Sequence, residues 1–203
     1  MRINTLIFLI VLTACNKTDP NSSILPNAAT NVSEDKGDSQ KKQIMGINKE
    51  ILAGLKNENY AALAKYIHPD RGIQLSMYSY ISENDKHFSK SEFEKYIHSD
   101  EKFTFGHKDG SGAVYTVSLP DYLKNWTFKK DFTKAKINYN IFEGKGNSLN
   151  NIKQKYPGAI TVENYLAGTV EYSYMDWNSL VFIFEKIDNQ YFIVCISNGQ
   201  WTV

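Results

Sequence analysis

Apolar side chains between residues 47 and 67 recur at the spacing of a helix that buries one face. The apolar positions are Ile47, Ile51, Leu52 and Leu55, followed by Tyr60, Leu63, Ala64 and Ile67. The polar run Asn57-Glu58-Asn59 interrupts this pattern, and Pro69 disfavours helical geometry in the residue before it, His68. The spacing therefore predicts a kinked helix or a helix pair that ends at His68 and packs through one face.

The middle of the chain mixes strand and helix signals. Residues 73–80 alternate apolar and polar side chains, which is typical of a strand with one buried face. Ser89 with Glu92 three residues later has the pattern of a capping box and predicts the start of a short helix. Ser118 predicts another helix start, with the helix running towards Trp126.

The C-terminal half of the chain is rich in β-branched and aromatic residues and is predicted to be mainly sheet. Asp188-Asn189 predicts a two-residue hairpin turn, because asparagine tolerates positive φ. The fold class predicted from these elements is α+β, with an N-terminal kinked helix or helix pair packed on a strongly curved, mainly antiparallel sheet. The predicted strands are Lys136 to Phe142, Ile160 to Leu166, Gly168 to Tyr174, Ser179 to Ile187 and Gln190 to Ser197.

The first residues have the pattern of an export signal. A basic start, with Arg2, precedes the apolar run Leu6 to Leu12, which as a helix would span only about 10 Å and is too short to cross a bilayer. The sequence Leu12-Thr13-Ala14-Cys15 follows and resembles the lipobox of bacterial lipoproteins, in which the cysteine is lipidated and becomes the new N-terminus. The alternative, a buried N-terminal helix ending in an ordinary cysteine, would need an amphipathic face that this segment lacks.

This pattern divides the chain into three parts. Residues 1–14 are predicted to be a lipoprotein signal peptide, and residues 15–43 to be a lipidated Cys15 followed by a flexible tether. The segment from Asn16 to Gln43 contains no aromatic side chain and is rich in polar residues, so it buries too little apolar surface to offset the entropy of ordering it. Residues 44–203 are predicted to form one α+β domain, anchored by Cys15 to a membrane of the bacterial cell envelope, at the periplasmic face or the cell surface.

Charge and cysteine content exclude several classes of protein. Beyond the signal peptide, 22 basic and 22 acidic side chains remain, so electrostatic capture of nucleic acid or anionic lipid is not expected. Two cysteines, Cys15 and Cys195, are too few for a disulfide framework or a cysteine-rich zinc site. Cys195 lies in a continuous apolar run and is expected to act as a small buried hydrophobic residue.

Two phrases of the sequence carry a resemblance to a known superfamily. Leu-Lys-Asn-Glu-Asn-Tyr-Ala-Ala-Leu-Ala-Lys-Tyr-Ile-His-Pro (Leu55 to Pro69), followed by a strand and a final meander, resembles the nuclear transport factor two-like cone. The ending, from Met175 to Leu180 and through Gln200 to Val203, is similar to a group of uncharacterised bacterial lipoproteins. The resemblance covers residues 45–203 and implies helices that cover a bent sheet and enclose a pocket. The superfamily includes isomerases, dehydratases and members that only bind or scaffold, and fold alone does not decide between them.

The sequence carries few signals of known chemistry. No HxxxH or HxH spacing joins the histidines, so no metal site is expected; they are His68, His87, His98 and His107. The sequence also lacks a Gly-x-Ser-x-Gly elbow, a phosphate-binding glycine loop and a dinucleotide fingerprint. No cofactor and no catalytic residue are therefore predicted.

The aromatic residues, 13% of the chain, either fill the curved sheet or line a binding surface. If the resemblance to the cone holds, turns at strand ends ring its open end. On that basis His68, Tyr78, Asp176 and Trp177 are predicted to cluster in one concavity, with Trp177 offering a ring and Asp176 an acceptor.

Three hypotheses about function follow. The first is a non-enzymatic, lipid-anchored envelope domain that binds a small molecule or an envelope protein. The second is a small isomerase or dehydratase with an Asp/His pair, such as His68 with Asp176, in an apolar pocket. The third is a structural envelope component that self-associates through an exposed apolar patch.

Overall fold

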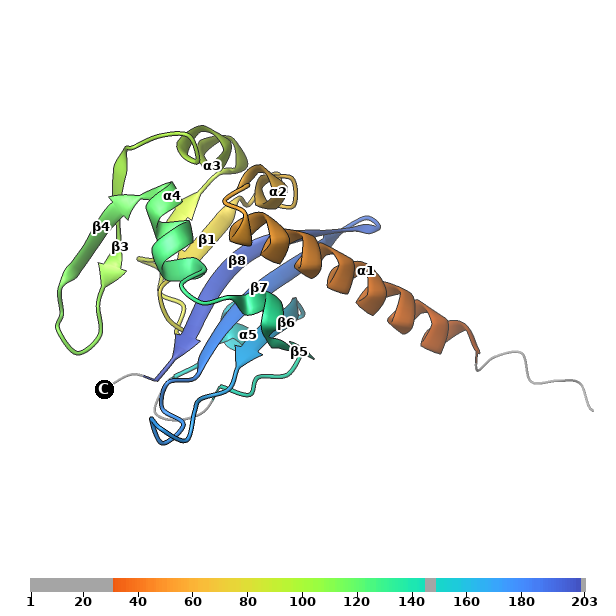
Figure 1. The fold of residues 1–203 in the computed structure, drawn as a ribbon. Coiled ribbons are helices and arrows are strands. Elements are labelled where there is room, and N and C mark those ends of the chain that lie inside the picture. Colours follow the sequence, from red (N-terminus) through yellow and green to blue (C-terminus); the bar gives the residue numbers. More distant parts are fainter. Residues whose placement is uncertain (1–30, 145–148, 202–203) are drawn as a thin grey trace, which may run out of the picture.

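The helical spacing near the N-terminus forms a long helix, α1 (Asn31–Lys56), and a short one, α2 (Ala61–Ala64). The computed structural model describes residues 31–144 and 149–201, so the signal peptide, Cys15 and the first part of the expected tether lie outside the described residues. The two helices are joined by a turn in which Glu58 has a φ of 55°. The predicted helix pair is confirmed, and α1 crosses one face of the sheet (Figure 1).

Helix α1 begins earlier than the hydrophobic pattern predicts. Residues 31–43, assigned to the flexible tether, belong to α1, and Gln40 Nε2 donates a hydrogen bond to Tyr139 Oη at 2.9 Å. Ile44 and Ile51 are fully buried and fix the central part of α1 on the sheet. Once that part is docked, each further residue adds a backbone hydrogen bond at little cost, so a polar sequence without proline continues the helix.

Six strands form the main sheet in the order β2-β1-β8-β7-β6-β5. All neighbouring pairs are antiparallel except β1 and β8, which are parallel. The predicted α+β class, with helices packed on a mostly antiparallel sheet, is confirmed. The strands are β1 (Ile73–Ser76), β2 (Lys86–Phe88), β5 (Lys136–Tyr139), β6 (Ile160–Leu166), β7 (Asn178–Ile187) and β8 (Gln190–Gln200).

A second sheet of two strands, β3 (Lys102–His107) and β4 (Val114–Ser118), lies at the side of the molecule away from the start of α1 (Figure 1). Around the sheets lie α3 (Lys90–Tyr96), α4 (Leu119–Tyr122), α5 (Ile152–Lys155), the short π-helix η1 (Leu123–Thr127) and the 3-10 helix η2 (Phe132–Lys134). The capping box of Ser89 and Glu92 is confirmed, and Ser118 accepts a hydrogen bond from Asp121 N as the N-cap of α4.

Both faces of the main sheet are buried. On the α1 side, the strands contribute Val162, Phe182, Phe184 and Ile196 to the larger apolar cluster. On the other side, Val181, Ile183 and Val194 pack under Ile152 and Tyr156 of the α5 region. Burial on both faces explains why β7 and β8 are continuous apolar runs and not alternating ones.

One predicted strand is wrong. Residues 168–174 form turns between β6 and β7, with Ser173 and Tyr174 at φ of 51° and 62°. Asp176 accepts hydrogen bonds from Thr169 N at 2.6 Å and Thr169 Oγ1 at 3.1 Å, and so closes the loop. A Cβ on Gly168 would lie 2.4 Å from the Tyr174 carbonyl oxygen, so this close approach requires glycine.

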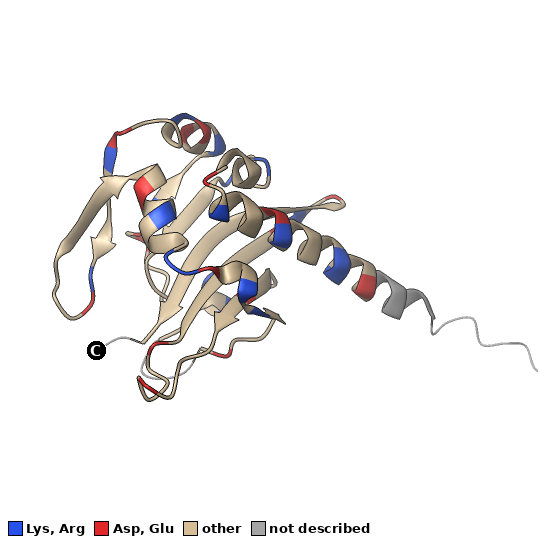
Figure 2. Cartoon of the chain, viewed as in Figure 1, with Lys and Arg blue, Asp and Glu red and all other residues tan. Residues whose placement is uncertain are grey.

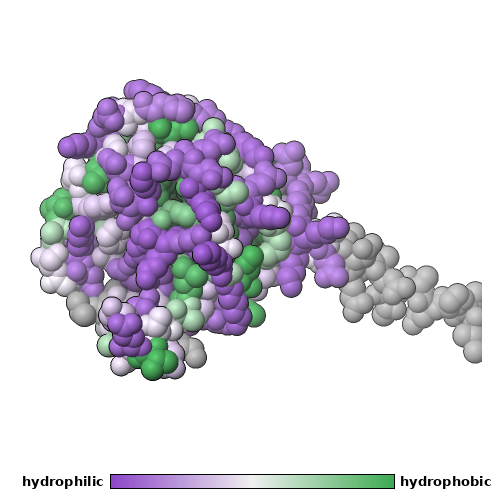
Figure 3. Space-filling model, viewed as in Figure 1, coloured by the Kyte–Doolittle hydropathy of each residue, from purple (hydrophilic) through white to green (hydrophobic). Residues whose placement is uncertain are grey.

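The surface carries charges of both signs. Basic and acidic residues are interspersed along α1 and around the domain (Figure 2), and hydrophilic side chains cover most of the face shown in Figure 3, between small apolar patches. No helix among the described residues combines the length and the apolar character that crossing a bilayer requires.

Candidate functional site

The structure does not bring the four predicted pocket residues together. His68 Nδ1 accepts hydrogen bonds from the backbone N–H groups of Asp70 and Arg71 at 3.2 and 3.0 Å, and His68 Nε2 lies 4.0 Å from Glu185 Oε2 near the end of β7. Asp176 precedes the start of β7 at Asn178. The stretch of strand between the two sites spans about 23 Å at 3.3 Å per residue, so His68 and Asp176 cannot share a site.

The other two predicted residues have structural contacts. Tyr78 Oη accepts a hydrogen bond from Asp109 N at 2.6 Å, and its ring packs edge-on against Trp126. Trp177 is 4% exposed, and its ring lies against Gly144 and Gly199. The Thr169 hydrogen bonds lower the pKa of Asp176, which fits its role as the clamp of the loop. Trp177 is therefore a core residue and does not offer its ring to a ligand.

Cys195 is fully buried, and burial raises the pKa of its thiol. This agrees with the expectation of a small buried hydrophobic residue. Within the ranges 31–144 and 149–201, no group of three metal-ligating side chains converges.

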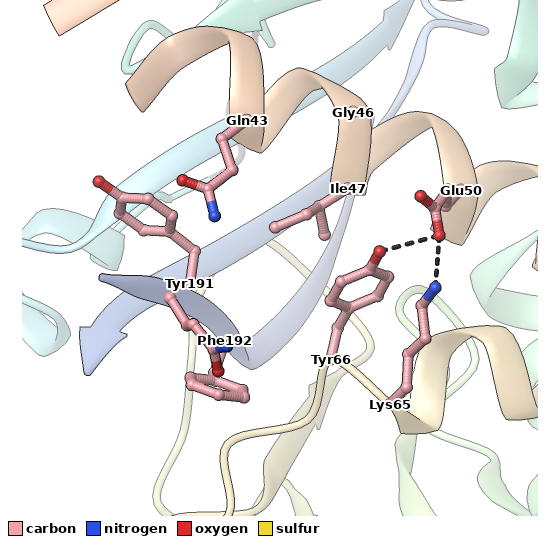
Figure 4. Close-up of a pocket in the computed structure, with 9 residues that line it drawn as sticks. Gln43, Gly46, Ile47, Glu50, Lys65, Tyr66, Tyr191 and Phe192 are labelled. Atoms are coloured by element: carbon pink, nitrogen blue, oxygen red, sulfur yellow. Dashed lines mark hydrogen bonds and ion pairs between the residues drawn. The ribbon is translucent and has the colours of Figure 1, made fainter. Parts of the chain in front are cut away.

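The structure instead shows a groove beneath α1, here called the α1 groove, with a volume of about 510 Å³ (Figure 4). One wall is the face of α1 that carries Gln43, Gly46, Ile47 and Glu50; the second is Lys65-Tyr66 after α2; the third is the start of β8, Gln190 to Phe192. The sequence pattern predicts Ile47 as part of a buried helix face, but none of these residues as part of a site, because they come from three distant segments that share no functional motif.

Local geometry explains why these walls meet. The α1 residues are separated by three or four positions, so their side chains follow one face of the helix. The segment after α2 is fixed to β8 by two backbone hydrogen bonds: Ile193 N donates to Tyr66 O at 2.7 Å, and His68 N donates to Ile193 O at 3.0 Å. These bonds hold Lys65 and Tyr66 below α1, beside the first residues of β8.

A charged cluster closes one end of the groove. Glu50 Oε2 accepts hydrogen bonds from Lys65 Nζ at 2.6 Å and from Tyr66 Oη at 2.8 Å (Figure 4). The Lys65 hydrogen bond, and then that of Tyr66, lower the pKa of Glu50, while Glu50 raises the pKa of Lys65. Burial, and then the hydrogen bond to Glu50, raise the pKa of Tyr66. At neutral pH the cluster is thus a carboxylate, an ammonium and a neutral phenol.

This protonation pattern favours recognition over proton transfer. General acid–base catalysis works best with a group whose pKa lies near the working pH, and each member of the cluster is shifted away from neutrality. The rest of the groove combines the side chains of Ile47, Tyr191 and Phe192 with the amides of Gln43 and Gln190. Apolar and aromatic surface with a few polar groups is the usual lining of a binding site.

Comparison with known proteins gives no information about the function of this chain. No protein-family model and no curated protein matches the chain. Among solved structures, an NTF-2-like protein of unknown function from Shewanella oneidensis MR-1 shares 13% identity at a TM-score of 0.35, over 79% of this chain and 99% of that one. A DUF4783 family protein from Bacteroides ovatus ATCC 8483 shares 15% identity at a TM-score of 0.28, over 74% and 92%. At TM-scores this low, neither likeness bears on the function of this chain.

Proposed function

We propose that this chain is a lipid-anchored protein of the bacterial cell envelope, held by Cys15, and that its α+β domain binds a ligand or partner in the α1 groove. The observation that supports binding is the groove itself, in which aromatic and aliphatic surface lies beside the cluster of Glu50, Lys65 and Tyr66. The proposal of an anchor is supported by the lipobox-like Leu12-Thr13-Ala14-Cys15 after a basic start and an apolar run.

A non-enzymatic role fits the groove better than catalysis. The isomerase or dehydratase alternative depended on His68 and Asp176 facing each other, and most of β7 lies between them. The ionisable side chains of the groove already neutralise one another, so they suit the orientation of a ligand more than the transfer of a proton.

The anchor is tested by labelling and fractionation. Cys15→Ser should abolish the incorporation of labelled palmitate and move the protein from the membrane fraction to the soluble fraction, because the acyl chains supply the membrane affinity. Cys195→Ala is the matched control, since it removes the other cysteine of the chain and should leave labelling unchanged. Membrane association of Cys15→Ser as firm as that of the wild type would refute the anchor.

The groove is tested by blocking it. A Cβ on Gly46 or on Gly37 meets no atom within 4 Å, so the backbone of α1 leaves room for a side chain to start at both positions. Only Gly46 lines the groove. In a thermal-shift screen of N-acetylated sugars, short peptides and fatty acids, a binding compound should stabilise the wild type and Gly37→Trp but not Gly46→Trp. A compound that stabilises all three chains equally binds elsewhere, and a screen in which no compound stabilises the wild type contradicts the proposal.

A further inference from the structure

The edge of β8 that faces away from β7 is only partly covered. β1 pairs with this edge from Cys195 to Ser197, and the segment Tyr66 to His68 covers it at Ile193. Within the described ranges, no strand or bridge pairs with residues 190–192 on this side. The edge is therefore open over its first three residues.

The direction of the backbone groups follows from the register. Ile187 and Gln190 flank the two-residue turn, and Lys186 pairs with Tyr191. Ile193 directs both its N–H and its C=O away from β7, to His68 and Tyr66. Backbone groups alternate between the two sides along an antiparallel strand, so the N–H and C=O of Tyr191 also point away from β7.

The open edge lies in the wall of the α1 groove, because Gln190, Tyr191 and Phe192 line it (Figure 4). The N–H and C=O of Tyr191 on this side have no backbone partner among residues 31–144 and 149–201. Such a donor and acceptor form a template for another extended backbone, which is the basis of peptide binding by strand addition. The segment Tyr66 to His68 already uses this edge in parallel with β8, so a ligand strand would continue its line.

Side chains around the edge suggest which peptide would fit. Ile47 and the buried ring of Tyr191 offer apolar contacts under α1. Glu50 uses only Oε2 for Lys65 and Tyr66, and Oε1 accepts no hydrogen bond from a described residue. Lys65 already neutralises the charge of Glu50, but the unused Oε1 is a hydrogen-bond acceptor that suits an N–H group of a lysine or arginine side chain.

We infer that the α1 groove takes an extended polypeptide segment of a partner protein, which adds as a strand to β8 through the backbone of Tyr191. An apolar side chain of this segment contacts Ile47 and Tyr191, and a basic side chain two residues away on the same face reaches Glu50. This inference rests on the proposed function of the groove as a binding site and specifies its ligand class.

The free protein gives a first test. In the full chain with Cys15→Ser, the amide of Tyr191 should exchange with solvent rapidly, whereas the amide of Ile193, bonded to Tyr66 O, should be protected. Equal protection of the two amides would show that the edge is closed and would overturn the inference.

The second test tethers a peptide beside the groove. Ser39, exposed on α1 about one turn before Gln43, is changed to cysteine in the Cys15→Ser chain and joined by a disulfide to Cys-Gly-Gly-Thr-Val-Thr-Lys-Thr. Ser111→Cys, in the exposed loop between β3 and β4, is the matched control. With an effective concentration of about 5 mM and a Kd of about 1 mM, exchange of the Tyr191 amide should slow by about sixfold with the Ser39 tether and not with the control.

Two N-methylated peptides separate strand addition from simple occupancy. In one, the first, third and fifth residues after the glycines are methylated; in the other, the second and fourth. Only every second N–H of an added strand faces β8, so one peptide should lose the protection of Tyr191 and the other should keep it. Equal behaviour of the two peptides would overturn the inference.

The result also distinguishes this inference from the proposed function. If the Ile47 methyl resonances shift while the exchange of Tyr191 is unchanged, the groove is occupied without strand addition, and only the inference fails. If neither changes, the inference fails too, and the groove as a binding site is then decided by the separate screen with Gly46→Trp.

Discussion

The attachment of α1 to the sheet depends on a buried pair of amides, and this pair gives the sharpest prediction for stability. Asn48 Nδ2 donates to Asn164 Oδ1 at 2.9 Å, and Asn164 Nδ2 donates back to Asn48 Oδ1 at 3.0 Å. Both residues are fully buried. Asn164→Leu removes both of these hydrogen bonds and a third, from Asn164 Nδ2 to Leu180 O at 3.2 Å, and leaves the amide of Asn48 buried without its partner.

The expected cost follows from these contacts. Three hydrogen bonds are lost, at about 1 kcal/mol each, and the orphaned Asn48 amide costs about 1–3 kcal/mol. These costs overlap, so the expected loss of stability is at least about 3 kcal/mol. For a domain of this size that corresponds to a fall in Tm of about 6–12 °C. The double variant Asn48→Leu with Asn164→Leu leaves neither amide unpaired, so it should lie within about 1 kcal/mol of the wild type.

Urea denaturation followed by circular dichroism measures the stability of Asn48→Leu, Asn164→Leu and the double variant. Asn125→Leu, on an exposed position of η1, is the control and is expected within about 0.5 kcal/mol of the wild type. The m value should not change. The reasoning is refuted if Asn164→Leu costs less than about 1 kcal/mol, or if the double variant loses the sum of the two single changes, because then the amides are not coupled.

Three further predictions concern α1 and one lysine. A chain beginning at Ile44 should melt about 5 °C below one beginning at Asn31, because it lacks the first half of α1; equal melting temperatures would show that this half is not docked. Gly46→Ala should stabilise the protein by about 0.5–1 kcal/mol, since the new Cβ meets no atom within 4 Å. Gly54→Ala should destabilise the protein, because neighbouring atoms would lie 2.7 and 2.9 Å from the new Cβ. The denaturation curves of the two variants should therefore shift in opposite directions. Burial lowers the pKa of Lys129 to about 8, so the unfolded chain binds this proton more tightly than the folded chain does. The free energy of unfolding should therefore rise as pH increases from about 8 to about 10. In melts at several pH values, Lys129→Gln should flatten that rise.

The helices and turns were predictable because their signals are local. The helical spacing of Ile51, Leu52 and Leu55 corresponds to a buried face, and the capping box at Ser89 forms as its pattern indicates. Asp188-Asn189 closes the predicted hairpin, with the positive φ at Asp188. In each case the physical cause lies within a few residues of the signal.

The mistaken strand at 168–174 shows where local patterns fail. Val170, Tyr172 and Tyr174 alternate as in a strand, yet they are 76%, 57% and 62% exposed. Alternation indicates a pleated surface only when a neighbouring strand pairs with it. Here the hydrogen bonds between Thr169 and Asp176 close the segment on itself, and that contact could not be ranked above a strand from sequence alone.

The prediction that His68 and Asp176 share a pocket was wrong for a different reason. His68 and Asp176 were both placed correctly near the ends of elements, but at opposite ends of β7, and which end of a strand a turn meets depends on the topology. The α1 groove depends on topology in the same way. Glu50, Lys65 and Tyr191 are ordinary residues in sequence, and only the pairing of the Tyr66 segment with β8 places them together.

That pairing also explains why the edge of β8 can stay open in a stable protein. The chain reaches β8 only at Tyr66 and turns at Gly72, whose φ of 65° and close contact with Phe88 fix the start of β1. The uncovered stretch of β8 is therefore only three residues long, 190–192, and it lies under α1 between Lys65 and Lys186. The Nζ atom of Lys186 lies 5.6 Å from the centroid of the Tyr191 ring. Long, flat, uncharged edges drive sheets to pair with one another, and natural proteins prevent this with short edges, lysines and covering helices. The edge at Tyr191 has all three protections, which disfavour pairing with another sheet and are compatible with the single extended segment inferred as its ligand.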